Sequence, residues 1–127
     1  MAGPTAQASL LITRLREQRM KWVELAALPG KRVRIIRPTE TELPEFFQGG
    51  RLTVGLDHVK RYVVDWEGFT EADLIGAALG ASDPVPFDAA LWAEVVADQS
   101  TWVRQLAQDL LDHVVAHRVA AAADEKN

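Results

Sequence analysis

The segment from Thr53 to Thr70 constrains the fold of this chain more strongly than any other part of its sequence. Its apolar residues recur at i, i+3, i+4 and i+7, which is the spacing of one face of an amphipathic helix: Val59, Tyr62, Val63 and Trp66. Gly68 ends the predicted helix, and Thr70 with Asp73 forms a capping pattern that opens a short helix through about Leu79. The pattern indicates two helices joined by a tight turn.

Helical signals also occupy both ends of the chain. Ser9 is placed to cap a helix that runs to about Leu28, where Pro29-Gly30 ends it. Asp88 is placed to cap another helix, after which the chain bends or restarts near 98–101 and continues as a helix to about Ala123. The apolar stripe of this last helix consists of Val103, Leu106, Leu110, Leu111 and Val114.

The middle of the N-terminal half has a different pattern. Residues 31–37 alternate basic and apolar side chains, with Val33 and Ile35 on one face, and Pro38 follows them. This alternation predicts one short β-like segment, for which the rest of the sequence offers no clear partner strand. It is therefore either an extended segment or an edge that pairs with another chain. Thr39 and Glu42 then resemble a capping box that opens a short helix through Phe47.

Together these signals predict a mainly α fold, a small helical domain of five to six helices with one short β-like segment near residues 31–37. The 127 residues suit a single domain over 1–127, with 1–8 and 122–127 disordered or frayed. No apolar run approaches the roughly 18 residues that a membrane-spanning helix needs, and the N-terminal residues do not resemble a signal peptide. We therefore expect no membrane partner.

The net charge of −4 conceals a strong asymmetry. Residues 1–37 hold eight basic and two acidic side chains, a net charge of +6, and the remainder of the chain has a net charge of −10. This separation favours head-to-tail contacts between copies or an anionic partner at one end. Alternatively, the basic segment packs over the acidic body of the same molecule.

Patterns that carry catalytic or metal chemistry are weak in this sequence. There are no cysteines, and His113 and His117, four residues apart, lack the Glu that a helical zinc-protease motif places after the first His. Asp65 and Glu67 would point to nearly opposite sides of a helix, which argues against a carboxylate pair. We expect no catalytic residues, no metal site and no cofactor.

The aromatic residues and the basic segment are the remaining candidates for binding. The basic segment has no aromatic residue to stack on bases, so nucleic-acid binding is disfavoured. Four Trp and four Phe are more often core residues than ligand platforms, but Phe46 and Phe47 cannot both face inward from one helix. An exposed aromatic near acidic residues marks a protein-binding surface.

The order of motifs from Lys31 to about Leu106 resembles that of the tail assembly chaperones of long-tailed bacteriophages and prophages. The motifs are the basic segment ending in Pro38, the acidic Thr39-Glu40-Thr41-Glu42, the sequence Val64-Asp65-Trp66-Glu67-Gly68-Phe69, and Asp83-Pro84-Val85-Pro86-Phe87-Asp88 followed by Leu91-Trp92. The chain departs from that pattern in a longer N-terminal basic helix and in a longer segment between Glu71 and Ser82.

The resemblance implies a protein that binds the phage tape-measure protein, keeps it soluble and helps recruit tail-tube subunits. It also implies self-association, a location in the cytoplasm of the bacterial host and absence from the mature virion. Alternatives are a structural virion protein, such as a head–tail connector or minor tail component, and a small nucleic-acid-binding protein. The candidate partner-binding residues are Phe46, Phe47, Trp66, Phe69, Trp92 and Trp102, and the candidate self-association residues are Arg32, Arg34 and Arg37.

Overall fold

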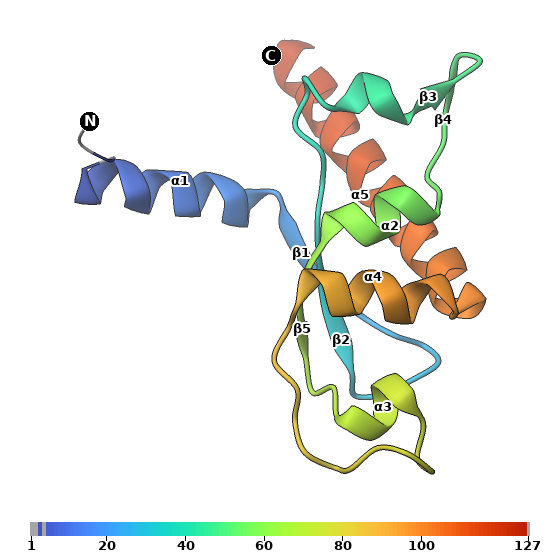
Figure 1. Ribbon diagram of the computed structural model, residues 1–127. Coiled ribbons are helices and arrows are strands. Elements are labelled where there is room, and N and C mark those ends of the chain that lie inside the picture. The colour runs from blue at the N-terminus through green and yellow to red at the C-terminus, as the bar shows by residue number, and fades with distance from the viewer. Residues whose placement is uncertain (1–2, 4, 127) are drawn as a thin grey trace.

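The structure, a computed structural model, describes residue 3 and residues 5–126 and has a mixed α/β architecture (Figure 1). It contains 52% helix and 17% strand. In chain order the elements are α1 (Ala6–Gln18), β1 (Met20–Glu24), β2 (Arg32–Ile36), the 3₁₀ helix η1 (Leu43–Phe46), β3 (Phe47–Gln48), β4 (Arg51–Leu52), α2 (Leu56–Tyr62), β5 (Val63–Glu67), α3 (Glu71–Ile75), α4 (Ala89–Ala97) and α5 (Ser100–Lys126). The prediction of a mainly helical domain is therefore wrong.

The predicted β-like segment is the centre of a three-stranded antiparallel sheet in the order β1-β2-β5. Both of its partner strands lie within segments that were predicted to be helical. Strand β1 replaces the second half of the helix expected over 9–28, and β5 replaces the end of the helix expected over 53–66. Both flanking strands contain β-branched or aromatic residues, which pack well on a pleated surface, so non-local pairing overrides their helical spacing.

One face of this sheet forms part of the core. Val33, Ile35 and Trp66 are buried there in one cluster with Trp92 of α4 and Leu106 of α5. A smaller adjoining cluster combines Ile36, Phe46, Tyr62 and Leu110. The sheet is thus covered by helices on one side, and α4 and α5 supply much of the cover (Figure 1).

The capping signals at Asp88 and Thr70 are realised where they were expected, but the prediction of Ser9 as the first cap is wrong because α1 begins at Ala6 with Thr5 as its cap. The Asp88 side chain accepts a hydrogen bond from the backbone N–H of Leu91 at 2.8 Å and begins α4. Thr70 and Asp73 form a reciprocal capping box, although α3 ends at Ile75 because Gly76 adopts a positive φ of 97°. Gly49-Gly50, with φ values of 57° and 78°, forms the tight turn of the β3–β4 hairpin.

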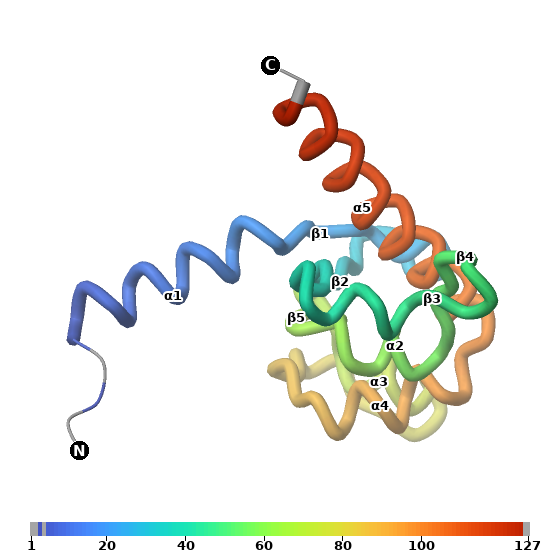
Figure 2. Tube along the Cα trace, turned by 90° about the horizontal axis from the view of Figure 1, so that it is seen from above, coloured from blue at the N-terminus to red at the C-terminus, as the bar shows by residue number. Residues whose placement is uncertain are grey.

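Both terminal helices extend beyond the body of the protein. Helix α1 projects sideways from the start of β1, and the C-terminal end of α5 rises away from the sheet (Figure 2). Residues 6–8 and 122–126 are helical, where disorder or fraying was expected; residues 1–2, 4 and 127 lie outside the described residues. None of the described helices is long and apolar enough to cross a lipid bilayer.

Candidate partner-binding surfaces

Five of the six aromatic residues proposed to bind a partner lie in the core. Phe46, Trp66, Phe69, Trp92 and Trp102 are all buried, whereas Phe47 is 38% exposed. The guanidinium of Arg118 lies 5.5 Å from the centroid of the Phe47 ring. Among the six candidates, only Phe47 therefore presents its ring to a partner in this structure.

The buried aromatic rings hold the layers of the fold together. Trp92 lies at the centre, with ring centroids 6.4 Å from Trp66 and 6.3 Å from Trp102. Its indole N–H donates to the backbone carbonyl of Val59 at 3.1 Å, and that of Trp66 donates to the carbonyl of Val85 at 2.6 Å. Because a helix leaves its last four carbonyls without an intrahelical donor, the bond to Val59 satisfies one of those in α2.

The three arginines proposed for self-association lie in different environments. Arg32 and Arg34 project from β2 onto the sheet face opposite the core, with their guanidiniums 4.6 and 5.5 Å from the Trp22 ring centroid. Arg32 also forms an ion pair with Glu67 at 2.7 Å. Burial, followed by the nearby charge of Arg19, lowers the pKa of Arg37. Arg32 therefore has a carboxylate partner within the molecule, whereas Arg34 lies over the Trp22 ring and its buried Nε has no hydrogen-bond partner among the residues that the structure describes.

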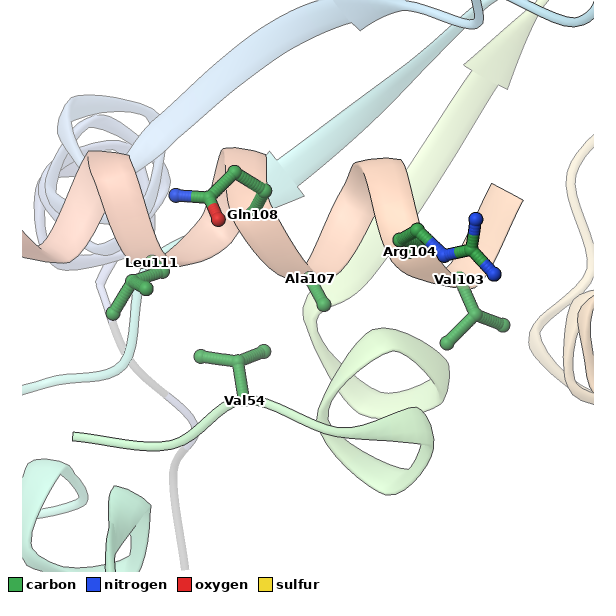
Figure 3. A pocket seen from close by; sticks show the side chains of 6 residues that line it. All are labelled: Val54, Val103, Arg104, Ala107, Gln108 and Leu111. Atoms are coloured by element: carbon green, nitrogen blue, oxygen red, sulfur yellow. The ribbon is translucent and has the colours of Figure 1, made fainter. Parts of the chain in front are cut away.

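An apolar groove runs along α5 (Figure 3). It has a volume of about 300 Å³ and is lined by Val54 and by Val103, Ala107 and Leu111 of α5, with Arg104 and Gln108 alongside. Val103, Ala107 and Leu111 are spaced four residues apart and are all only partly buried. The groove therefore offers an apolar ridge of the kind that packs against another helix.

The sequence grouped two faces of α5 into a single stripe. Leu106, Leu110 and Val114 are buried in the core, whereas Val103 and Leu111 line the open groove. Val103, Ala107 and Leu111 are four residues apart, and this spacing could have indicated a second apolar face of the helix. The indication was weak because the middle residue is a small alanine.

A second apolar surface lies on α1, which has no buried residue along its length. Leu11, Ile12 and Leu15 share one face of this helix with Ala8, and Leu15 is 60% exposed. The side chain of Thr5 accepts a hydrogen bond from the N–H of Ala8 at 3.1 Å and begins the helix. A projecting helix with an open aliphatic stripe typically marks an interaction surface.

The ionisable groups with shifted pKa values are dispersed over the fold. The backbone hydrogen bond from Thr39 and the nearby charge of Arg61 lower the pKa of Glu42. Burial opposes ionisation of Asp73, but its hydrogen bonds from Thr70 and Lys31 hold its pKa below the usual value. These two carboxylates stabilise turns and caps.

The two histidines considered as metal ligands have other contacts. A ring nitrogen of His113 lies 2.9 Å from the backbone oxygen of Arg19, and burial lowers the pKa of His113. His117 lies 3.7 Å from a carboxylate oxygen of Glu40. Across the described part of the chain, no three His, Cys, Asp or Glu residues form a group able to hold a metal ion.

The chain matches no family model, no curated protein and no solved structure. The order of sequence motifs and the geometry of the molecule are therefore the basis for proposing a function. The molecule presents the exposed α1 stripe and the partly exposed α5 groove at the periphery of a well-packed core.

Proposed function

We propose that this protein is a tail assembly chaperone of a long-tailed bacteriophage or prophage. It binds the tape-measure protein, keeps it soluble and helps recruit tail-tube subunits, and it acts in the cytoplasm of the bacterial host without entering the mature virion. The observation that carries the proposal is the pair of open apolar helical surfaces, because a long helical protein with apolar stripes needs such surfaces to mask it.

The α5 groove has the form that helix-in-groove recognition requires. Its ridge from Val103 to Leu111 spans about 12 Å at 1.5 Å per residue, so it fits roughly two turns of a partner helix. Such a short contact gives low affinity at each site. Low affinity suits a chaperone, because tail-tube subunits must later displace it while many copies together still cover a long partner.

The α1 stripe provides a second contact at a distance from the groove. Leu11, Ile12 and Leu15 are each about half exposed or more, so each has apolar area to bury against a partner. At about 25 cal/mol per Å², covering a few hundred Å² of this face contributes several kcal/mol before ordering costs are subtracted. Two separate weak contacts allow the protein to bridge neighbouring turns of a tape-measure helix or neighbouring helices.

Co-expression with the tape-measure protein tests the groove. Ala107→Glu places a carboxylate on the groove wall, whereas Ala116→Glu places the same side chain on an exposed position of the same helix. We expect Ala107→Glu to reduce the soluble fraction of the tape-measure protein several-fold and Ala116→Glu to leave it unchanged. Equal solubilisation by both variants, with unchanged melting temperatures, would remove the groove from the proposal.

A matched pair of variants tests the α1 stripe. Leu11→Gln with Leu15→Gln replaces two of the three aliphatic residues of the α1 stripe by good helix formers, and Thr13→Gln changes the other side of α1. We expect only the double variant to lose tape-measure binding in a pull-down. Purified particles provide the check on class, because this protein in stoichiometric amounts in finished virions would favour the structural alternative.

A further inference from the structure

A polar hollow of about 320 Å³ lies where α1 meets the body of the protein. Its lining includes Arg16 from the last turn of α1, Arg19 from the C-cap of that helix, Arg61 and Tyr62 from α2, and Glu42 from the turn before η1. The hollow is separate from the α5 groove, with which it shares no lining residue.

The base of α1 is held in place at this point. The backbone oxygen of Arg19 accepts a hydrogen bond from the N–H of Arg37 at 2.9 Å and lies 2.9 Å from a ring nitrogen of His113. The guanidinium of Arg19 donates to the backbone oxygen of Arg37 at 3.3 Å. These contacts keep Arg19 at the rim of the hollow although the rest of α1 projects into solvent.

The hollow carries an excess of positive charge. Arg61 is already paired with Glu42 at 2.9 Å and with Glu45 at 2.8 Å. Among residue 3 and residues 5–126, no carboxylate lies within 4.0 Å of the guanidinium of Arg16 or Arg19. Neither arginine therefore forms a direct ion pair with a described residue at this site, although the charge of Arg19 contributes to lowering the pKa of Glu42 in the same hollow.

Tyr62 adds an unused hydrogen-bond donor beside these arginines. Its side chain is among the lining of the hollow, the residue is only 3% exposed, and its hydroxyl has no hydrogen-bond partner. Burial, followed by the negative charge of Glu42, raises the pKa of this phenol. A buried hydroxyl without a partner is unusual in native proteins, so this donor is available to an acceptor oxygen that enters the hollow, with the Glu42 carboxylate as the competing acceptor nearby.

Arg16 and Arg19 also follow the apolar face of α1 towards its C-terminal end. Arg16 follows Ile12 by four residues and Arg19 follows Leu15 by four, so each lies on the same side of the helix as the residue before it. A partner that covers the α1 stripe therefore meets the two arginines one turn later. An acidic residue next to the apolar stripe of the partner would reach the hollow.

We propose that this hollow binds the side-chain carboxylate of a partner polypeptide, with Arg16 and Arg19 as the cationic ligands and the Tyr62 hydroxyl as a further donor. A carboxylate suits planar guanidinium groups, which bind it through paired N–H donors. The net charge of −4 opposes a phosphate polyanion such as nucleic acid more strongly than it opposes a single carboxylate. The inference rests on the proposed function for the identity of the partner, and it specifies an acidic residue beside the apolar stripe of that partner.

The test begins with the full-length protein and small probes that need no partner. Propionate carries the carboxylate of a glutamate side chain, and propionamide is its neutral counterpart. In an NMR titration at constant ionic strength we expect saturable shifts at Arg19 and Tyr62 with propionate and none with propionamide. Arg19→Gln should weaken propionate binding by at least about tenfold, whereas Arg14→Gln, on the same helix but outside the hollow, should leave it unchanged.

Several results would overturn the inference. Absence of saturable propionate binding, or equal binding by Arg19→Gln and Arg14→Gln, would rule out the carboxylate site. Saturable binding of inorganic phosphate without propionate binding would replace it with a phosphate site. Tyr62→Phe provides a second check that keeps the fold, since it should weaken propionate binding without lowering the melting temperature.

A peptide experiment separates this inference from the proposed function. Tape-measure peptides that contain a glutamate beside an apolar stripe are compared with the same peptides carrying glutamine. Tighter binding of the glutamate form, lost in Arg19→Gln, supports the carboxylate site. Equal binding of both forms overturns the site but keeps the chaperone proposal, whereas propionate binding without any peptide binding keeps the site and overturns the proposed partner.

Discussion

Replacing Trp92 by Phe should destabilise this protein far more than the loss of a few ring atoms suggests. Trp92 is fully buried between Trp66 and Trp102, and its indole N–H donates to the Val59 carbonyl at 3.1 Å. Phenylalanine keeps an aromatic ring at this position but has no donor. The substitution therefore leaves a carbonyl in the last turn of α2 without a partner in the core.

The expected loss follows from two contributions. Leaving a buried acceptor without its hydrogen bond costs about 1–3 kcal/mol. The smaller ring removes a few tens of Å² of buried apolar area, which costs roughly 1 kcal/mol more. A total of about 2–4 kcal/mol corresponds to a fall in melting temperature of roughly 10 °C for a domain of this size.

Urea unfolding followed by far-ultraviolet circular dichroism measures this loss. The matched variant is Trp22→Phe, because Trp22 is only half-buried on the outer sheet face, where the guanidinium of Arg32 lies 4.6 Å from its ring centroid. We expect that control to lose about 1 kcal/mol or less. If Trp92→Phe is no less stable than Trp22→Phe, the indole does not satisfy the end of α2 and the reasoning is refuted.

Three further changes probe the fold. Gly80→Ala would place its Cβ 2.6 Å from the backbone of Ala72, so we expect a loss of about 1–3 kcal/mol, and an unchanged melting temperature would contradict it. Gln105→Ala removes the bond from its amide to the Glu24 carbonyl at 2.7 Å; thermal unfolding should show a loss of about 1 kcal/mol, and faster hydrogen exchange should be confined to the loop after Glu24. Burial lowers the pKa of His113, so the unfolded state binds more protons and stability should fall as pH decreases below about 6.5. His113→Gln should flatten that slope, and an unchanged slope would contradict the assignment.

Local sequence signals were sufficient to predict the structure where residues within a short stretch of chain satisfy the backbone hydrogen-bonding groups of that same stretch. The cap at Asp88, the capping box of Thr70 with Asp73 and the break at Gly49-Gly50 all occur as the residue types indicated. Each depends on side chains and dihedral angles within a few residues, so the sequence nearby contains the necessary information. The same holds for the long final helix α5.

The prediction failed where helix and strand compete for the same residues. Val63 and Trp66 have helical spacing with Val59, yet they lie in β5, which pairs with β2. Val63 and Val64 are β-branched, and the strand also buries Val63 and Trp66. A helix buries residues that are three or four apart, and a strand that contains a bulge can bury residues at the same spacing. The spacing of the apolar residues alone therefore could not distinguish a helix from a strand here.

The residues that were chosen from the sequence for the candidate site differ from those that the structure exposes. The resemblance implied an apolar surface for another polypeptide, and the aromatic residues were chosen to supply it. The structure instead buries five of those six rings and leaves open the aliphatic side chains of α1 and the α5 groove. Burying a large aromatic ring removes more apolar area from water than burying an aliphatic side chain, so it contributes more free energy to folding. Those five aromatic rings therefore lie in the core, and smaller aliphatic residues remain at the surface.

The sequence by itself determined where helices begin at Asp88 and Thr70, where the chain turns at Gly49-Gly50, and that residues 31–37 are extended. Only the tertiary structure decided that this extended segment has two partner strands and that α5 divides its apolar residues between core and groove. The physical reason is distance along the chain. A cap or turn is stabilised by residues that are neighbours in sequence. The hydrogen bonds from Trp92 to the Val59 carbonyl and from Gln105 to the Glu24 carbonyl form only after remote segments have come together.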